Sequence, residues 1–225
     1  MDNSMNLNVK EIAAKIEAEL RALPVRNIPN EREIRRKYSQ MLKKANPEFI
    51  LNLASELKEK CRYRVFAYEL IRSHKEAFQS IGEKELEEFG RGINSWWSVD
   101  AFARTLAGPA WLRGQVTDGL IHKWAHSEDL WWRRAALVST VALNMRSQGG
   151  MGDALRTLEV CCLLVDDHDD MVVKAMSWAL RVLVVHDPGE VSEFLNKNED
   201  VLAARVKREV QNKLTTGLKN PKKRG

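Results

Sequence analysis

The chain of 225 residues is long enough to bury a sizeable core, and its 44% hydrophobic and 30% charged residues are typical of a folded protein. Its formal net charge of +5 and pI near 9.1 are compatible with nucleic-acid binding but do not by themselves indicate it. No apolar run approaches the roughly 20 residues of a membrane-spanning helix, so we set membrane proteins aside. Residues 1–20 carry acidic side chains and helical periodicity rather than the regions of a secretory signal, so we expect a cytoplasmic protein.

The three cysteines give no sign of a disulfide framework or of a metal site. Cys161 and Cys162 are adjacent and Cys61 is far from both, so no Cys-x-x-Cys spacing occurs, and a reducing cytoplasm is the simplest interpretation. The run Asp166–Asp170, which contains His168, could be taken for metal ligands, but acidic loops that cap helices are commoner. We therefore expect no metal.

Apolar residues recur at helical spacing along the chain, first over residues 9–23 and then over residues 34–42. Two β-branched runs, Val138–Val141 and Val182–Val185, would also suit strands, but the longer helical patterns around them favour helices. Capping residues precede several apolar runs, for example Ser127 with Asp129, and Asp187 before Pro188.

Short breaks divide these helical patterns into segments of roughly 10 to 20 residues. This spacing predicts an all-α, HEAT- or armadillo-like solenoid of stacked antiparallel helix pairs, with a concave basic face, over a single domain of residues 1–216. A plain helical bundle is the alternative. The breaks fall at Pro24–Pro29, Asn46–Pro47, Ser80–Gly82, Gly90–Asn94, Gly108–Pro109, His126–Ser127, Gln148–Gly150, Asp166–Asp170, Asp187–Pro188 and Asn196–Asp200.

The C-terminal segment is strongly basic. Residues 205–225 hold eight basic residues against the single Glu209, and we expect residues 217–225 to be a disordered tail. The segment could be a solubilising terminus or an arm that contacts phosphates, and in the second case Arg208 is a candidate phosphate contact.

All seven tryptophans lie between Trp96 and Trp178, and the first cluster combines two of them with a carboxylate. Trp96 and Asp100 are four residues apart, so on a helix they share one face. Neighbouring helical positions point about 100° apart, so Trp96 and Trp97 cannot both enter one core, and one of them should be half exposed. The structural alternative is a partly buried Trp96 and an Asp100 that pairs with Arg104.

The second and third clusters add cations to aromatic rings. Trp131–Trp132 is followed by Arg133 and Arg134, which offer forked donors for phosphates, although arginine stems lying over tryptophan rings would explain the pattern equally well. Lys174, Trp178 and Arg181 form one helical stripe, where Trp178 serves either a ligand or a contact with the next repeat. On adjacent repeats, the three clusters would give a basic, aromatic surface suited to a nucleic-acid backbone.

At these clusters the sequence resembles the HEAT-like DNA alkylation repair glycosylases of the AlkD type, most clearly over residues 90–215. The resemblance rests on Trp-x-x-x-Asp at Trp96 and Asp100, on Trp-x-Arg-Arg-Ala-Ala-Leu at Trp131–Leu137, and on Lys-Ala-x-x-Trp-x-Leu-Arg at Lys174–Arg181. It implies a monofunctional enzyme that excises cationic N3- or N7-alkylated purines from duplex DNA. No metal or organic cofactor is then needed, and the location is the bacterial cytoplasm at the nucleoid.

The resemblance also assigns residues. Asp100 matches the catalytic carboxylate, Trp96 and Trp178 match aromatic residues beside the lesion's deoxyribose, and Arg134 matches a DNA-contacting arginine. Trp97 stands where the best-known members often carry a carboxylate, and residues 25–38 match their opening helices poorly. We expect DNA contacts from Arg134, Arg133, Lys174, Arg181, Trp97 and Arg208.

Two other functions fit the same residues. A non-catalytic relative would bind distorted or damaged DNA through the cations and show salt-dependent affinity without base release. A protein-interaction scaffold would use the exposed tryptophans as an aromatic patch. Nothing in the sequence indicates oligomerisation, and we expect a monomer.

Overall fold

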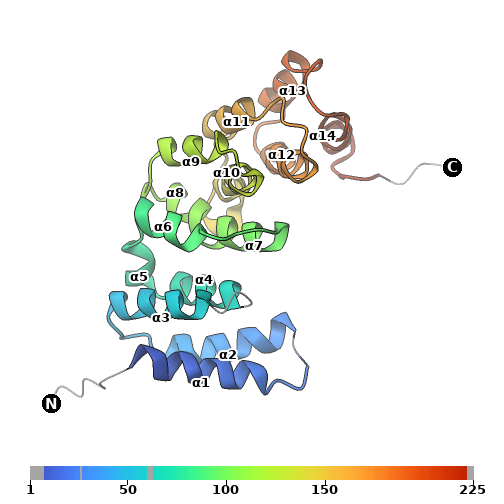
Figure 1. Ribbon diagram of the computed structural model, residues 1–225. Coiled ribbons are helices and arrows are strands. Elements are labelled where there is room, and N and C mark those ends of the chain that lie inside the picture. The colour runs from blue at the N-terminus through green and yellow to red at the C-terminus, as the bar shows by residue number, and fades with distance from the viewer. Residues whose placement is uncertain (1–7, 26, 60–62, 222–225) are drawn as a thin grey trace. The chain divides into compact units, whose positions relative to one another are not determined.

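The structure, a computed structural model, describes residues 8–25, 27–59 and 63–221 (Figure 1). Helices dominate these ranges and no strand occurs within them, so the prediction of an all-α, solenoid-like chain is confirmed. Cys61 and residues 222–225 of the predicted tail lie outside the described residues. Across the described part of the chain, no helix is both long and apolar enough to cross a membrane.

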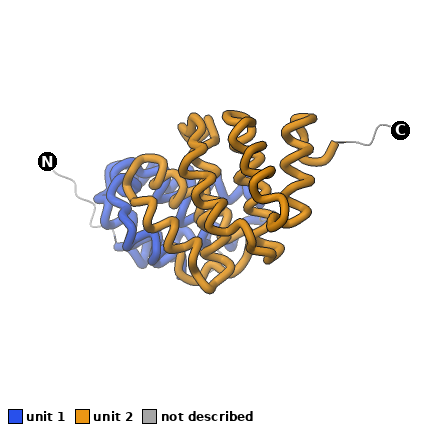
Figure 2. Tube along the Cα trace, turned by 90° about the horizontal axis from the view of Figure 1, so that it is seen from above, with its two compact units in different colours: residues 1–89 blue, residues 90–225 orange. Residues whose placement is uncertain are grey.

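The chain forms two compact units, residues 1–89 and residues 90–225, which Figure 2 shows in different colours. The predicted single domain over residues 1–216 stays a prediction. The helices of the first unit are α1 (Val9–Arg21), α2 (Ile28–Met41), α3 (Pro47–Glu59), α4 (Arg64–Ser73), α5 (Lys75–Gln79) and α6 (Glu83–Gly90), the last of which ends at the boundary.

The first unit is held together by an apolar core and by two polar ties to its last helix. Helix α3 packs on α1 and α4, and Ile16, Ile50 and Leu53 are fully buried between helices. Lys58 Nζ donates to the carbonyl of Glu88 at 2.7 Å, and Tyr68 Oη donates to the carbonyl of Phe89 at 2.9 Å. These bonds satisfy carbonyls at the end of α6, which have no partner within the helix.

The second unit carries the tryptophan clusters. Helices α10, α12 and α14 form one row, in which α12 packs against both of the others, and α9 and α11 cover α10 from the other side (Figure 1). The helices are α7 (Trp96–Phe102), the π-helix η2 (Ala103–Ala107), α8 (Gly108–Leu112), α9 (Asp118–Ala125), α10 (Leu130–Asn144), the 3-10 helix η3 (Arg146–Gln148), α11 (Ala154–Leu163), α12 (Asp170–Leu183), α13 (Pro188–Lys197) and α14 (Ala204–Thr216).

The predicted break at Gly108–Pro109 is wrong, because α7, η2 and α8 follow one another without a gap from Trp96 to Leu112. Pro109 stands in the first turn after the π-helix, where its missing N–H is tolerated. Gly108 has a packing role, since a Cβ there would lie 2.6 Å from the carbonyl oxygen of Ser139. The glycine therefore lets this helical run lie directly against α10.

The predicted helix starts are confirmed at two acidic caps. Asp129 precedes α10 and accepts a hydrogen bond from the N–H of Trp131 at 2.9 Å. Asp187 precedes α13 and accepts from the N–H of Glu190 at 3.1 Å. The β-branched run Val138–Val141 is helical, as predicted, and the run that starts at Val182 ends helix α12.

The described part of the basic tail begins at a helix end. Gly217 caps α14 with a φ of 74°, a left-handed conformation that favours glycine. Lys219 Nζ then lies 3.3 Å from the buried carboxylate of Glu209. Residues 217–221 thus lie close to the helix that they follow.

Candidate active site

The centre of the site is an ion pair between Asp100 on α7 and Arg134 on α10. Arg134 Nε donates to Asp100 Oδ1 at 2.9 Å, and Arg134 Nη2 donates to Oδ2 at 3.0 Å. Two parallel bonds from a planar guanidinium fix both the position and the plane of the carboxylate. Asp100 therefore has a defined orientation before any ligand arrives.

The pair is anchored to a third helix. Arg134 Nη1 donates to the carbonyl of Met171 in the first turn of α12, so one side chain ties α7, α10 and α12 together. The Arg134 side chain is 6% exposed, whereas the Asp100 side chain is 17% exposed. The cation is thus enclosed by protein, while the carboxylate keeps a route to solvent.

Short-range contacts determine where α7 begins. Ser95 is the N-cap residue, and its N–H donates to Ser98 Oγ at 3.2 Å. The side chains of Trp96 and Trp97 in the first turn are 57% and 44% exposed. The sequence predicted one half-exposed ring, and the structure exposes both, with Trp96 one turn before Asp100.

Trp178, on α12, contacts Arg104, which the sequence analysis had named only as a possible partner of Asp100. The guanidinium carbon of Arg104 lies 5.4 Å from the centroid of the Trp178 ring, within the range of a cation–π contact. The alternative partner for Asp100 was Arg104, but Asp100 pairs with Arg134 and Arg104 lies over Trp178. The indole face is therefore in a position where it already attracts positive charge.

The Trp132 side chain packs inside the second unit and contributes to its structure. Its ring packs against Trp124, with ring centroids 4.9 Å apart, and edge-on against Phe102, with centroids 6.0 Å apart. Gly90 admits this ring, because a Cβ at that position would lie 2.3 Å from it. This aromatic cluster fixes α7, through Phe102, against α9 and α10.

Arg133 is engaged within the protein as well. Its Nε donates to Asp167 Oδ2 at 2.7 Å, and its Nη1 donates to the carbonyls of Ser127 and Glu128 at 3.0 and 2.8 Å. These bonds join the loop before α10 to the loop before α12. Arg133 thus has a structural role in the second unit.

The sequence matches the protein family described as DNA alkylation repair enzyme over residues 8–214. The chain belongs to this family. No curated protein matches it in a direct comparison. Family membership gives this chain an enzymatic role in DNA repair, with DNA as its partner.

In this DNA alkylation repair protein, the three remaining predicted DNA contacts lie on α12 and α14. Lys174 is exposed and pairs with Asp170 at 2.6 Å. Arg181 Nε donates to Ser177 Oγ at 3.1 Å, and burial lowers the pKa of its guanidinium although Glu209 raises it. Arg208 is exposed on α14.

Three groups of this repair protein make contacts in the structure that the sequence analysis did not predict. Arg104 was considered only as a partner of Asp100, and the Met171 carbonyl carries no sequence signal. The third group is the buried Glu209, which accepts from Ser177 Oγ at 2.6 Å. Of the three, only Glu209 could have been noticed in the sequence, because it is the single acidic residue in a basic segment.

The described ranges contain no cluster of three or more His, Cys, Asp or Glu side chains able to hold a metal ion. The acidic run Asp166–Asp170 instead serves structure. Asp167 accepts from Arg133, Asp169 caps α12 by accepting from the Met171 N–H at 2.9 Å, and Asp170 pairs with Lys174 and Arg205.

Proposed function

We propose that this protein is a monofunctional DNA glycosylase that hydrolyses the N-glycosidic bond of cationic N3- or N7-alkylated purines in duplex DNA. Asp100 is the proposed catalytic carboxylate, and Trp96 and Trp178 are the proposed aromatic neighbours of the deoxyribose. The observation that carries the proposal is the partly exposed Asp100 carboxylate, held by the Arg134 fork and preceded by exposed Trp96.

The chemistry suits these groups. The bond between C1′ and the purine nitrogen breaks, and its electron pair leaves with the base, so that the cationic base departs neutral without a strong general acid. Positive charge develops on the sugar, where an ionised carboxylate stabilises it electrostatically. Water then adds to C1′ and releases its proton to Asp100 or to solvent.

The tryptophan rings contribute to the same step. Indole faces attract cations, and the contact between Arg104 and Trp178 illustrates that attraction in the free protein. A sugar cation over Trp96 or Trp178 would be stabilised in the same way. We propose that Arg134 acts as a positioning residue, since its buried guanidinium points at Asp100 and Met171.

The remaining predicted DNA residues fall into two groups. Exposed Lys174, Arg208 and Trp97 are the proposed contacts to the DNA backbone, together with the half-buried Arg181. Arg133 supports the loops beside them through its three donated bonds.

The test is release of 7-methylguanine and 3-methyladenine from methylated duplex DNA, with the wild type compared with Asp100→Asn. We expect release by the wild type, and loss of release in Asp100→Asn with duplex affinity retained. Asp200→Asn, at an exposed loop carboxylate, is the matched control and should excise at the wild-type rate. Turnover retained by Asp100→Asn would overturn the catalytic assignment.

One observation favours a second function, namely DNA binding without excision. Arg134 already engages both oxygens of Asp100, and this pairing lowers the negative charge that the carboxylate can offer to a sugar cation. A protein of this kind would bind duplex DNA in a salt-dependent manner and release no base from any alkylated substrate.

A further inference from the structure

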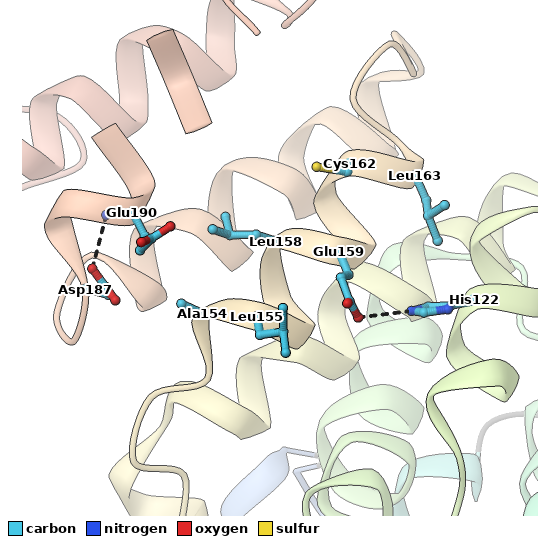
Figure 3. Close-up of a pocket in the computed structure, with 9 residues that line it drawn as sticks. All are labelled: His122, Ala154, Leu155, Leu158, Glu159, Cys162, Leu163, Asp187 and Glu190. Carbon is cyan, nitrogen blue, oxygen red and sulfur yellow. Dashed lines mark hydrogen bonds and ion pairs between the residues drawn. The ribbon is translucent and has the colours of Figure 1, made fainter. Parts of the chain in front are cut away.

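A second site lies away from Asp100, on the other face of the second unit. A pocket of about 680 Å³ opens over α11, between α9 and the start of α13 (Figure 3). Its apolar floor is formed by Ala154, Leu155, Leu158 and Leu163. The row of α10, α12 and α14, which carries Arg134 and Trp178, takes no part in its lining.

Helix α11 has two apolar faces, of which only one is covered. Val160 and Cys161 are fully buried against the rest of the unit. The other face presents Leu155, Leu158 and Cys162 at positions i, i+3 and i+7, the spacing by which one helix packs on another. Leu155 is 72% exposed, so the pocket displays a large apolar side chain to solvent.

Acidic groups surround this apolar floor. Glu159, Asp187 and Glu190 line the pocket, and the single basic group among the lining residues is His122, whose Nε2 lies 3.8 Å from Glu159 Oε2. In Figure 3, Leu155 and Leu158 lie between Asp187 and Glu190 on one side and the His122–Glu159 pair on the other. An acidic rim repels the phosphates of DNA and attracts cations.

The local field is consistent with this arrangement. Burial and the Glu159 carboxylate raise the pKa of the Cys162 thiol, while Lys197 lowers it. Lys197 itself pairs with Glu193 at 2.5 Å, so its charge is offset close by. The carboxylates of Glu159, Asp187 and Glu190 give the apolar strip its negatively charged border.

We propose that this pocket binds a cationic amphipathic helix of a partner protein. The apolar side chains of that helix would pack on Leu155 and Leu158, and its lysine or arginine side chains would pair with Glu159 and Glu190. An apolar groove recognises a helix by residues spaced three and four apart, and complementary charges on the rim determine the choice of partner and its orientation. Because the pocket and the Asp100 site use different helices, the partner binds independently of DNA.

The test uses the full chain and a labelled 14-residue peptide amide of sequence LKKLLKLLKKLLKL, with binding followed by fluorescence anisotropy. We expect Leu155→Ser to weaken binding by about tenfold through lost apolar burial, and Glu159→Lys/Glu190→Lys to weaken it by at least as much. The same peptide with glutamate in place of lysine should not bind. A saturating DNA duplex should leave the affinity unchanged.

Matched controls change the same chemistry elsewhere. Leu218→Ser removes another exposed leucine, and Glu199→Lys/Asp200→Lys reverses two exposed carboxylates outside the pocket. Both should bind the cationic peptide as the wild type does.

Four results would overturn the proposal, and three of them come from the peptide measurements. These are wild-type affinity in Leu155→Ser, equal binding of the acidic peptide, and no binding of the cationic peptide at about 1 mM. Self-association of the wild type that disappears in Leu155→Ser, measured by sedimentation velocity, would assign the pocket to a second copy of the chain and overturn the proposed partner.

Discussion

Arg134 donates to both carboxylate oxygens of Asp100, at 2.9 and 3.0 Å, although the two residues are 34 positions apart in the chain and lie on different helices. The same guanidinium also donates to the carbonyl of Met171. One buried cation therefore fixes the carboxylate of the candidate active site and links three helices of the second unit.

This relationship predicts strong energetic coupling. Arg134→Gln should lower the free energy of unfolding by about 3–5 kcal/mol, because it leaves Asp100 and the Met171 carbonyl without their donor. Asp100→Asn should cost about 1–3 kcal/mol. In urea denaturation, the double variant should lose less than the sum of the two single variants, by about 0.5–3 kcal/mol. Additive losses would show that the pair is not coupled.

The exposed tryptophan beside Asp100 should matter for catalysis and little for stability. Trp96→Leu is expected to slow excision roughly 2- to 30-fold by removing one cation–π contact from the transition state, with unfolding changed by less than about 0.5 kcal/mol. Single-turnover base release measures the first effect and thermal unfolding the second.

Trp132→Leu is the contrasting variant, because its ring packs against Trp124 and Phe102. We expect a loss of roughly 2–4 kcal/mol in stability there. If Trp96→Leu excised as fast as the wild type, its proposed place beside the sugar would be wrong.

Two arginines should behave differently although both were predicted to contact DNA. Arg208 is exposed, so Arg208→Gln should make the plot of log K against log salt less steep by about 1 without changing stability. Arg133 donates to Asp167 and to two carbonyls, so Arg133→Gln should lower stability by about 1–3 kcal/mol and leave the salt slope unchanged. Equal salt slopes for wild type and Arg208→Gln would remove Arg208 from the DNA contacts.

The buried carboxylate of Glu209 predicts a pH dependence. Burial raises its pKa, but the Ser177 hydroxyl, Lys219 and Arg181 together hold that pKa below the ordinary value of 4.5. A carboxylate whose pKa is lowered by folding stabilises the protein above its unfolded-state pKa and loses that contribution as the pH falls through the folded-state pKa.

The stability lost in Glu209→Gln should therefore be large at neutral pH and should shrink as the pH falls below 4.5. Urea denaturation of both proteins at about pH 7 and about pH 3.5 measures the difference. Glu193→Gln, at an exposed pair with Lys197, serves as the control. A pH-independent difference for Glu209→Gln would contradict the assignment.

The helical pattern carried the prediction of fold class because a helix is a local structure. Caps such as Asp129 and Asp187 act on N–H groups two or three residues away, and the sequence therefore located those helix starts. The same local logic failed at Gly108–Pro109, where residues that usually break a helix are accommodated by a π-helix and by the close approach of α10.

The motifs containing Asp100, Trp96 and Trp178 were likewise visible in the sequence, and with them the family. The sequence by itself determined that helices carry these residues and that DNA alkylation repair enzymes are their relatives. Tertiary structure alone decided that Asp100 pairs with Arg134 and not with Arg104, which lies four residues further along in the adjoining π-helix η2. The reason is physical: spacing fixes which residues share a helix face, whereas the partner of a charge depends on which other helix packs against that face.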